Sequence, residues 1–144
     1  MLVTQILKSK GTDGVVSVKP GTRVSQAAEL LSQRRIGTVI ISGDGKQVAG
    51  ILSERDIVRE IGRRGAACLS ELVENMMTSE IKVCLPNDDA DSVLKTMTEG
   101  RFRHMPVVED GAMVGLITLG DVVKARLSEL SMEKEALQGM IMGH

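Results

Sequence analysis

The stretch GILSERD at residues 50–56 returns in altered form as GLITLGD at residues 115–121. Each copy reads glycine, two apolar residues, serine or threonine, two further residues and aspartate. An apolar run that leads into Ser/Thr-x-x-acid and then into a helical apolar pattern indicates a strand that turns directly into a helix. The sequence of 144 residues therefore contains the same strand-to-helix junction twice.

The repetition extends on both sides of this junction. Pro20 recurs as Pro86, and each proline is followed by an apolar stripe with i, i+3, i+4, i+7 spacing that begins at Val24 in the first copy and at Ala90 in the second. Such a stripe predicts an amphipathic helix. We therefore predict two copies of one unit of roughly 60 residues, each reading strand, helix, strand, strand, helix.

The expected strands are short and rich in β-branched residues. They cover residues 15–18, 37–41 and 48–52 in the first copy and 81–85, 104–108 and 113–117 in the second. The last helix of each copy has an apolar side, formed by Ile57, Val58 and Ile61 in the first copy and by Val122, Val123 and Leu127 in the second. The fold class expected from this order is α/β (α+β).

The repeat divides the chain into three parts. We expect residues 1–65 to form the first repeat with an N-terminal helix, residues 66–130 the second repeat, and residues 131–144 a helical tail that continues the last helix. This tail could cap the module or pack on a second subunit.

Composition excludes several classes of function. The 18 Lys and Arg against 19 Asp and Glu give a net charge of −1, so no overall attraction to nucleic acid or to an anionic membrane is expected. One Phe without Tyr or Trp provides no platform for stacking bases. No apolar run approaches the roughly 20 residues of a membrane span. Two cysteines outside any cluster fit a reducing, cytoplasmic location.

Catalysis and metal binding are also not expected. The two histidines are His104 and the terminal His144, and no nucleophile–base pair, P-loop or Gly-x-Ser-x-Gly pattern accompanies them. His104 lacks a Cys or His partner at ligand spacing, so we predict no metal site.

The duplicated motif allows two interpretations. Ser53 with Asp56, and Thr118 with Asp121, could simply cap their helices, because Ser/Thr-x-x-acid resembles a capping box. The same geometry suits a ligand: helix N-terminal N–H groups and the hydroxyl could bind a phosphate, and the aspartate could accept hydrogen bonds from ribose hydroxyls. The glycine that opens each motif would let a ligand approach the backbone closely.

These features together resemble a tandem pair of cystathionine-β-synthase (CBS) domains, also called a Bateman module. The resemblance rests on the repeated strand–helix pattern, on Pro20 and Pro86, and on the two motifs, and it covers the chain from about Thr4 to Leu130. It implies two repeats that pack through their sheets with pseudo-twofold symmetry and leave clefts for adenosine-containing ligands. In this family the ligands are AMP, ADP, ATP, NAD or S-adenosylmethionine.

The resemblance also implies which residues contact the ligand. Asp56 and Asp121 would hold ribose, Ser53 and Thr118 phosphate, and Arg55 and Arg103 could pair with phosphate. The remaining expected contacts are Ser17, Val18, Gly37, Thr38 and Val39 in the first copy, and Val83, Cys84, His104, Met105 and Pro106 in the second. Because Arg103 replaces Gly37, the second site is expected to favour polyphosphates.

The expected function is that of a non-catalytic sensor of adenine nucleotides. Its output would pass through a conformational or oligomeric change to a protein partner, and a homodimer is expected because twofold pairs are the commonest assembly. The alternative is an interaction scaffold or dimerisation module that binds no ligand and whose motifs are only helix caps.

Overall fold

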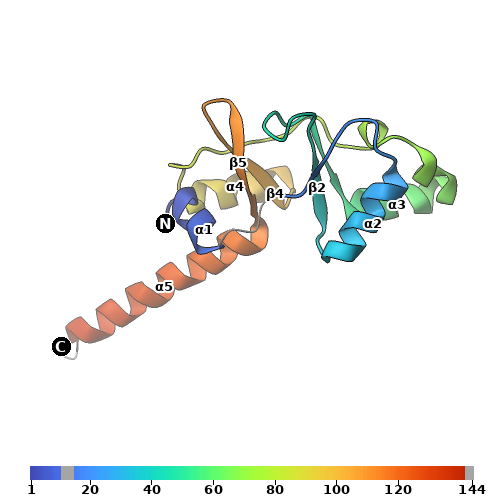
Figure 1. Ribbon diagram of the computed structural model, residues 1–144. Helices are drawn as coiled ribbons and strands as arrows, with labels where there is room; N and C mark the ends of the chain where they lie inside the picture. Colours follow the sequence, from blue (N-terminus) through green and yellow to red (C-terminus); the bar gives the residue numbers. More distant parts are fainter. Residues whose placement is uncertain (11–14, 142–144) are drawn as a thin grey trace. The chain divides into compact units, whose positions relative to one another are not determined.

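The computed structural model describes residues 1–10 and 15–141, which group into two compact units (Figure 1). Of these residues, 15–82 and 110–114 form the first-repeat unit, and 1–10, 83–109 and 115–141 form the second-repeat unit. Both units contain helices and strands, which confirms the predicted mixed α/β class.

The first-repeat unit is built on a three-stranded sheet with the order β1-β2-β3. Strand β1 (Ser17–Val18) runs parallel to β2 (Thr38–Ile41), which runs antiparallel to β3 (Gly50–Ser53). All four residues of β2 are buried, as expected for a central β-branched strand. The register sets Thr38 opposite Ser53, so the central strand ends beside the first motif.

Two helices cover this sheet, α2 (Val24–Arg34) and α3 (Glu54–Arg64), followed by the short 3₁₀ turns η1 (Ala66–Ser70) and η2 (Val73–Asn75). The predicted stripe of α2 is confirmed, because its apolar residues enter one core with residues of β2, β3 and α3 (Figure 1). This core comprises Val24, Ala27, Leu31, Val39, Ile41, Leu52, Ile57 and Val73.

The second-repeat unit contains α1 (Val3–Ser9), α4 (Ala90–Gly100), β4 (His104–Glu109), the C-terminal part of β5 (Ala112–Thr118) and the long helix α5 (Leu119–Ile141). Strands β4 and β5 pair as a hairpin. Asp110 and Gly111 between them have φ of 53° and 79°, the left-handed conformation that two-residue hairpin turns require.

The N-terminal helix α1 packs in the second-repeat unit, although it precedes the first repeat in the chain. Val3 and Ile6 are buried in the core of that unit, and the Val3 N–H donates to the Asp88 carbonyl at 2.9 Å. The equivalent contact in the first-repeat unit is made by Val73, whose N–H donates to the Thr22 carbonyl at 2.8 Å. The predicted boundary at residue 65 divides the chain by sequence repeat. The compact units instead group segments that pack together, so α1 belongs to the second-repeat unit.

Two details differ from the sequence-based expectation. Residues 81–85 form no regular strand; only Cys84 pairs with β4, because the side chains of Val83 and Leu85 are half exposed and Pro86 has no N–H to extend the ladder. Of the apolar residues predicted for the last helix of each repeat, Ile57 and Val122 are buried, and the others are exposed rather than packed on the core: Val58, Ile61, Val123 and Leu127.

Among residues 1–10 and 15–141, no helix has the length and apolar character of a membrane span. The expected tail is the C-terminal part of α5, and residues 142–144 lie outside the described residues.

Candidate functional site

The first motif forms a capping box at the start of α3. The Asp56 N–H donates to Ser53 Oγ at 3.2 Å, and the Ser53 N–H donates to Asp56 Oδ2 at 2.9 Å. The serine hydroxyl acts here as an acceptor, so its own proton remains available to donate. The local i, i+3 spacing is sufficient to build this arrangement.

The second motif repeats this geometry at the start of α5. The Asp121 N–H donates to Thr118 Oγ1 at 3.1 Å, and the Thr118 N–H donates to Asp121 Oδ2 at 2.9 Å. The capping interpretation is therefore confirmed in both repeats. It does not exclude the ligand interpretation, because each carboxylate keeps acceptor capacity.

The helix N-termini offer fewer free N–H groups than predicted. The first N–H of α3, from Glu54, donates to the Gly37 carbonyl, and the first N–H of α5, from Leu119, donates to the Arg103 carbonyl, both at 2.8 Å. The third N–H in each helix is used by the cap. Arg55 and Gly120 are the second residues of their helices, and their N–H groups take part neither in the bond to the preceding carbonyl nor in the cap.

The two glycines that open the motifs make room for side chains of the protein itself. A Cβ on Gly50 would overlap the Met77 side chain, and a Cβ on Gly115 would lie 2.8 Å from Leu7 Cδ2. Both glycines are needed because a side chain of the protein itself crosses the strand there.

The two aspartates differ in their cationic partner. Asp56 Oδ1 accepts from Arg59 Nη2 at 2.9 Å, one turn along the same helix. Asp121 Oδ2 instead accepts from Lys10 Nζ at 2.8 Å, and the same ammonium donates to the Leu116 carbonyl at 2.9 Å. Lys10 therefore ties the segment after α1 to the second motif.

The oxygens of the two carboxylates are occupied differently as a result. Both oxygens of Asp56 have a partner, one from the cap and one from Arg59. In Asp121 the cap and Lys10 share Oδ2, and Oδ1 accepts no hydrogen bond from the described residues. The second motif thus has an oxygen ready to accept a donor from a ligand.

The pKa of the Asp121 carboxyl reflects this environment. Burial raises the pKa, but the Lys10 ammonium and the hydrogen bonds from Thr118 outweigh burial, so the pKa lies below its ordinary value. The carboxylate is charged at neutral pH and serves as an acceptor.

Several predicted contact residues lie within the cores of their units. The side chains of Val39 and Met105 are 0% and 1% exposed and pack in the two hydrophobic cores. Thr38, Cys84 and Pro106 are buried as well. Burial, together with the charge of Asp88, raises the pKa of the Cys84 thiol to about 12, so this cysteine is a neutral core residue. Only the backbone of these residues could meet a ligand.

The remaining predicted residues are accessible. Ser17, Arg55, Val83 and Arg103 are exposed, and Val18, Gly37, Ser53, His104, Thr118 and Asp121 are partly exposed, as is Asp56. The backbone bonds from Glu54 to Gly37 and from Leu119 to Arg103 join each motif to the residue before the central strand. Within each unit the structure therefore brings together the predicted motif and the predicted start of the central strand.

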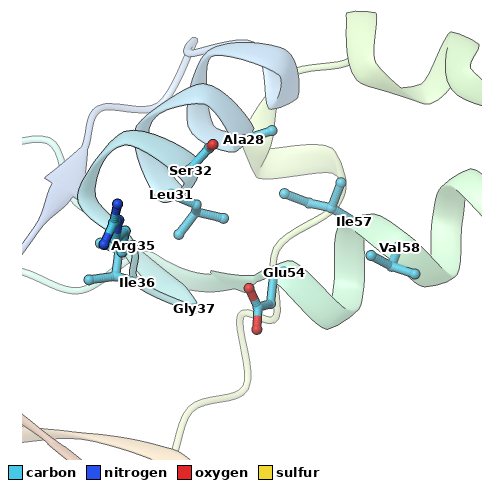
Figure 2. A pocket seen from close by; sticks show the side chains of 9 residues that line it. All are labelled: Ala28, Leu31, Ser32, Arg35, Ile36, Gly37, Glu54, Ile57 and Val58. Carbon is cyan, nitrogen blue, oxygen red and sulfur yellow. The ribbon is translucent and has the colours of Figure 1, made fainter.

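A pocket of about 480 Å³ lies between α2 and α3 of the first-repeat unit (Figure 2). Leu31 and Ile57 provide apolar walls, and Arg35 and Glu54 provide polar groups. Of the predicted contact residues only Gly37 lines it, so this pocket is not the predicted ligand site.

Sequence reasoning missed Lys10 and Arg59 as partners of the motif aspartates. Arg59 could have been found, because it lies three residues after Asp56 on the helix. For Lys10 the signal was weaker: VTQILKSK at residues 3–10 resembles VENMMTSE at residues 73–80, which suggests that the segment before each repeat is itself duplicated.

The comparisons with known proteins agree with this architecture. The family model of the CBS domain matches residues 7–63 and 73–128. The mitochondrial CBS domain-containing protein CBSX3 of Arabidopsis thaliana is 32% identical over 98% of this chain and 72% of its own length.

Solved structures are similar over most of the chain. The CBS-domain containing protein ATU1752 from Agrobacterium tumefaciens has 42% identity and a TM-score of 0.82, covering 88% of this chain and 99% of its own. The CBS domain protein PAE2072 from Pyrobaculum aerophilum, complexed with AMP, has 26% identity and a TM-score of 0.76, covering 92% of this chain and 99% of its own.

Proteins of this kind are generally regulatory rather than catalytic. The duplicated strand-to-helix junction, the matched mixed α/β units and the two family-model matches lead to one conclusion: the chain belongs to the CBS domain family and carries two CBS domains in tandem.

Proposed function

We propose that the chain is a regulatory module that binds an adenosine-containing ligand and has no catalytic activity. The observation that carries the proposal is the second motif, where Asp121 Oδ1 accepts no hydrogen bond from the described residues, the Thr118 hydroxyl lies at the cap and Lys10 lies 2.8 Å from the carboxylate. A ribose diol needs acceptors and a phosphate needs donors and positive charge, and this site supplies each of them. The AMP complex of the Pyrobaculum relative supports the same ligand class.

The candidate ligands are AMP, ADP, ATP, NAD and S-adenosylmethionine. Among them we favour those with a phosphate for the second repeat, because Lys10 and the exposed Arg103 add positive charge near its motif. The first motif has Gly37 where the second has Arg103, and both carboxylate oxygens of its Asp56 already have a partner within the protein. We therefore expect the second repeat to bind the more tightly.

Binding would act by shifting the chain between two arrangements, since a ligand changes an equilibrium only through different affinities for its two states. The output would pass to a homodimer or to a regulated protein partner. Free, buried Cys68 and Cys84 support a reducing compartment such as the predicted cytoplasm, and the Arabidopsis relative is mitochondrial.

The alternative function is an interaction scaffold that binds no nucleotide, which the two complete capping boxes favour. Thermal unfolding followed by circular dichroism separates the two functions. At 100 times its dissociation constant a ligand should add about 2.7 kcal/mol, which raises Tm by roughly 10 °C. Unchanged Tm values with all five ligands would favour the scaffold.

A further inference from the structure

The pocket between α2 and α3 of the first-repeat unit has the volume of a small-molecule site. It measures about 480 Å³, and ligand pockets in proteins span roughly 300–1,000 Å³. Leu31 extends from α2 and Ile57 from α3 toward the space between the two helices (Figure 2). These walls are apolar, so a molecule that fills the pocket needs an apolar part.

The second repeat fills the corresponding space with its own side chains. Three lining positions of the pocket carry bulky apolar residues in the second copy, and all three of those residues pack against the core of the second-repeat unit. The changes are Ala28 to Leu94, Ile36 to Phe102 and Glu54 to Leu119. The duplicated fold therefore does not itself require an open space at this place.

Two charged side chains of opposite sign line the pocket. Arg35 ends α2 with φ 54°, and Glu54 begins α3 with its N–H bound to the Gly37 carbonyl at 2.8 Å, so both backbones are fixed. Within residues 1–10 and 15–141, neither side chain forms an ion pair or hydrogen bond, including with the other. A guanidinium binds a carboxylate through paired hydrogen bonds, and a carboxylate accepts from an ammonium group, so the two charges match a zwitterion.

Gly37 makes room for the acidic group of this pair. A Cβ at position 37 would lie 3.4 Å from Glu54 Oε1, so the carboxylate lies against the backbone of the glycine. This negative charge disfavours a phosphate in the pocket, since like charges repel. The pocket therefore suits a different class of ligand from the nucleotides expected at the two motifs.

We propose that the pocket binds a free α-amino acid with an apolar side chain. The carboxylate of the ligand pairs with Arg35, its ammonium group pairs with Glu54, and its side chain lies between Leu31 and Ile57. The site does not rest on the proposed function, because Gly37 is the only residue that it shares with the predicted adenosine contacts.

Nuclear magnetic resonance titration of the isotope-labelled chain tests the ligand class, with L-leucine and L-phenylalanine as probes. The tighter of the two should cause saturable shifts of amide signals in α2 and α3. Its des-amino acid and its amide should each bind about 10-fold more weakly, since each loses a hydrogen bond between charged groups. Absence of saturable shifts with both amino acids, or equal binding of either analogue, would overturn the proposal.

Substitutions in the pocket test the named residues. Arg35→Gln and Glu54→Gln should each weaken binding about 10-fold. Ala28→Leu should abolish binding, because it introduces the larger side chain that the second repeat has at the same position. Arg34→Gln is the matched control, since Arg34 is exposed on α2 and does not line the pocket. Binding that survives Ala28→Leu, or that both charge substitutions leave unchanged, would contradict the proposed site.

Sedimentation velocity separates a small ligand from a protein occupant of the pocket. Ala28→Leu should keep the oligomeric state of the wild type, and a change of that state would assign the pocket to a contact between copies and overturn the proposal. AMP titration of the same samples keeps the two functions apart. A chain that binds the amino acid and not AMP would refute only the adenosine site, and the reverse result would refute only the amino-acid site.

Discussion

The two motif aspartates have the same cap and different surroundings. Asp56 pairs with Arg59, whose side chain is 64% exposed and lies on the same helix. Asp121 pairs with Lys10, which is 33% exposed and comes from the segment after α1. A cap can therefore be duplicated as a local unit, whereas its charge environment depends on a segment from elsewhere in the chain. The difference predicts unequal stability and unequal ligand affinity in the two repeats.

The largest expected effect concerns the glycines. Gly50→Ala should destabilise the protein by about 1–3 kcal/mol, because the new Cβ overlaps Sδ and Cγ of the Met77 side chain. Gly115→Ala should cost less, about 1 kcal/mol, since it meets only the terminal methyl groups of Leu7. Urea unfolding of both variants measures the difference, and equal losses would show that neighbouring side chains relax equally in the two units.

A smaller difference is expected from the cations. Lys10→Met should cost about 1 kcal/mol, because it leaves the partly buried Asp121 carboxylate without its ion-pair partner. Arg59→Met should cost only a few tenths of a kcal/mol, since the Arg59 side chain is 64% exposed, although that of Asp56 is 13% exposed, and ion pairs one turn apart on a helix contribute little. Chemical unfolding at neutral pH measures both. A larger loss for Arg59→Met would reverse our ranking of the two sites.

The smallest effect is a dependence on acid. The pKa of Asp121 is lowered below 3.8 in the folded protein, so the stabilisation by Lys10 is present above that pH and is lost as the pH falls through the lower folded value. The stability gap between wild type and Lys10→Met should therefore be larger at about pH 6 than at about pH 3. Unfolding free energies at the two pH values test this, and a constant gap would exclude the ion pair as its cause.

Local features of the candidate site could be predicted from the sequence. The capping boxes depend on residues three apart, and the pairing of Thr38 with Ser53 follows from two apolar runs joined by a turn. The stripes of α2 and α4 likewise place the correct residues in the cores.

Contacts between distant segments could not be predicted in the same way. Lys10 pairs with Asp121, which lies far away in the sequence, and Met77 fills the space beside Gly50. Neither contact is indicated by the periodicity of apolar residues in the sequence. Apolar spacing also did not distinguish the buried Ile57 from the exposed Val58, because both lie toward the same side of the helix.

Calorimetric titration of AMP into wild type, Asp121→Asn and Asp56→Asn tests most directly whether these carboxylates hold a ribose. Asparagine keeps an oxygen for the cap and removes the charge. We predict that Asp121→Asn weakens AMP binding about 10- to 100-fold, as expected for lost hydrogen bonds to a charged group, and that Asp56→Asn has the smaller effect. AMP affinity that is the same in the wild type and in both folded variants would contradict the account.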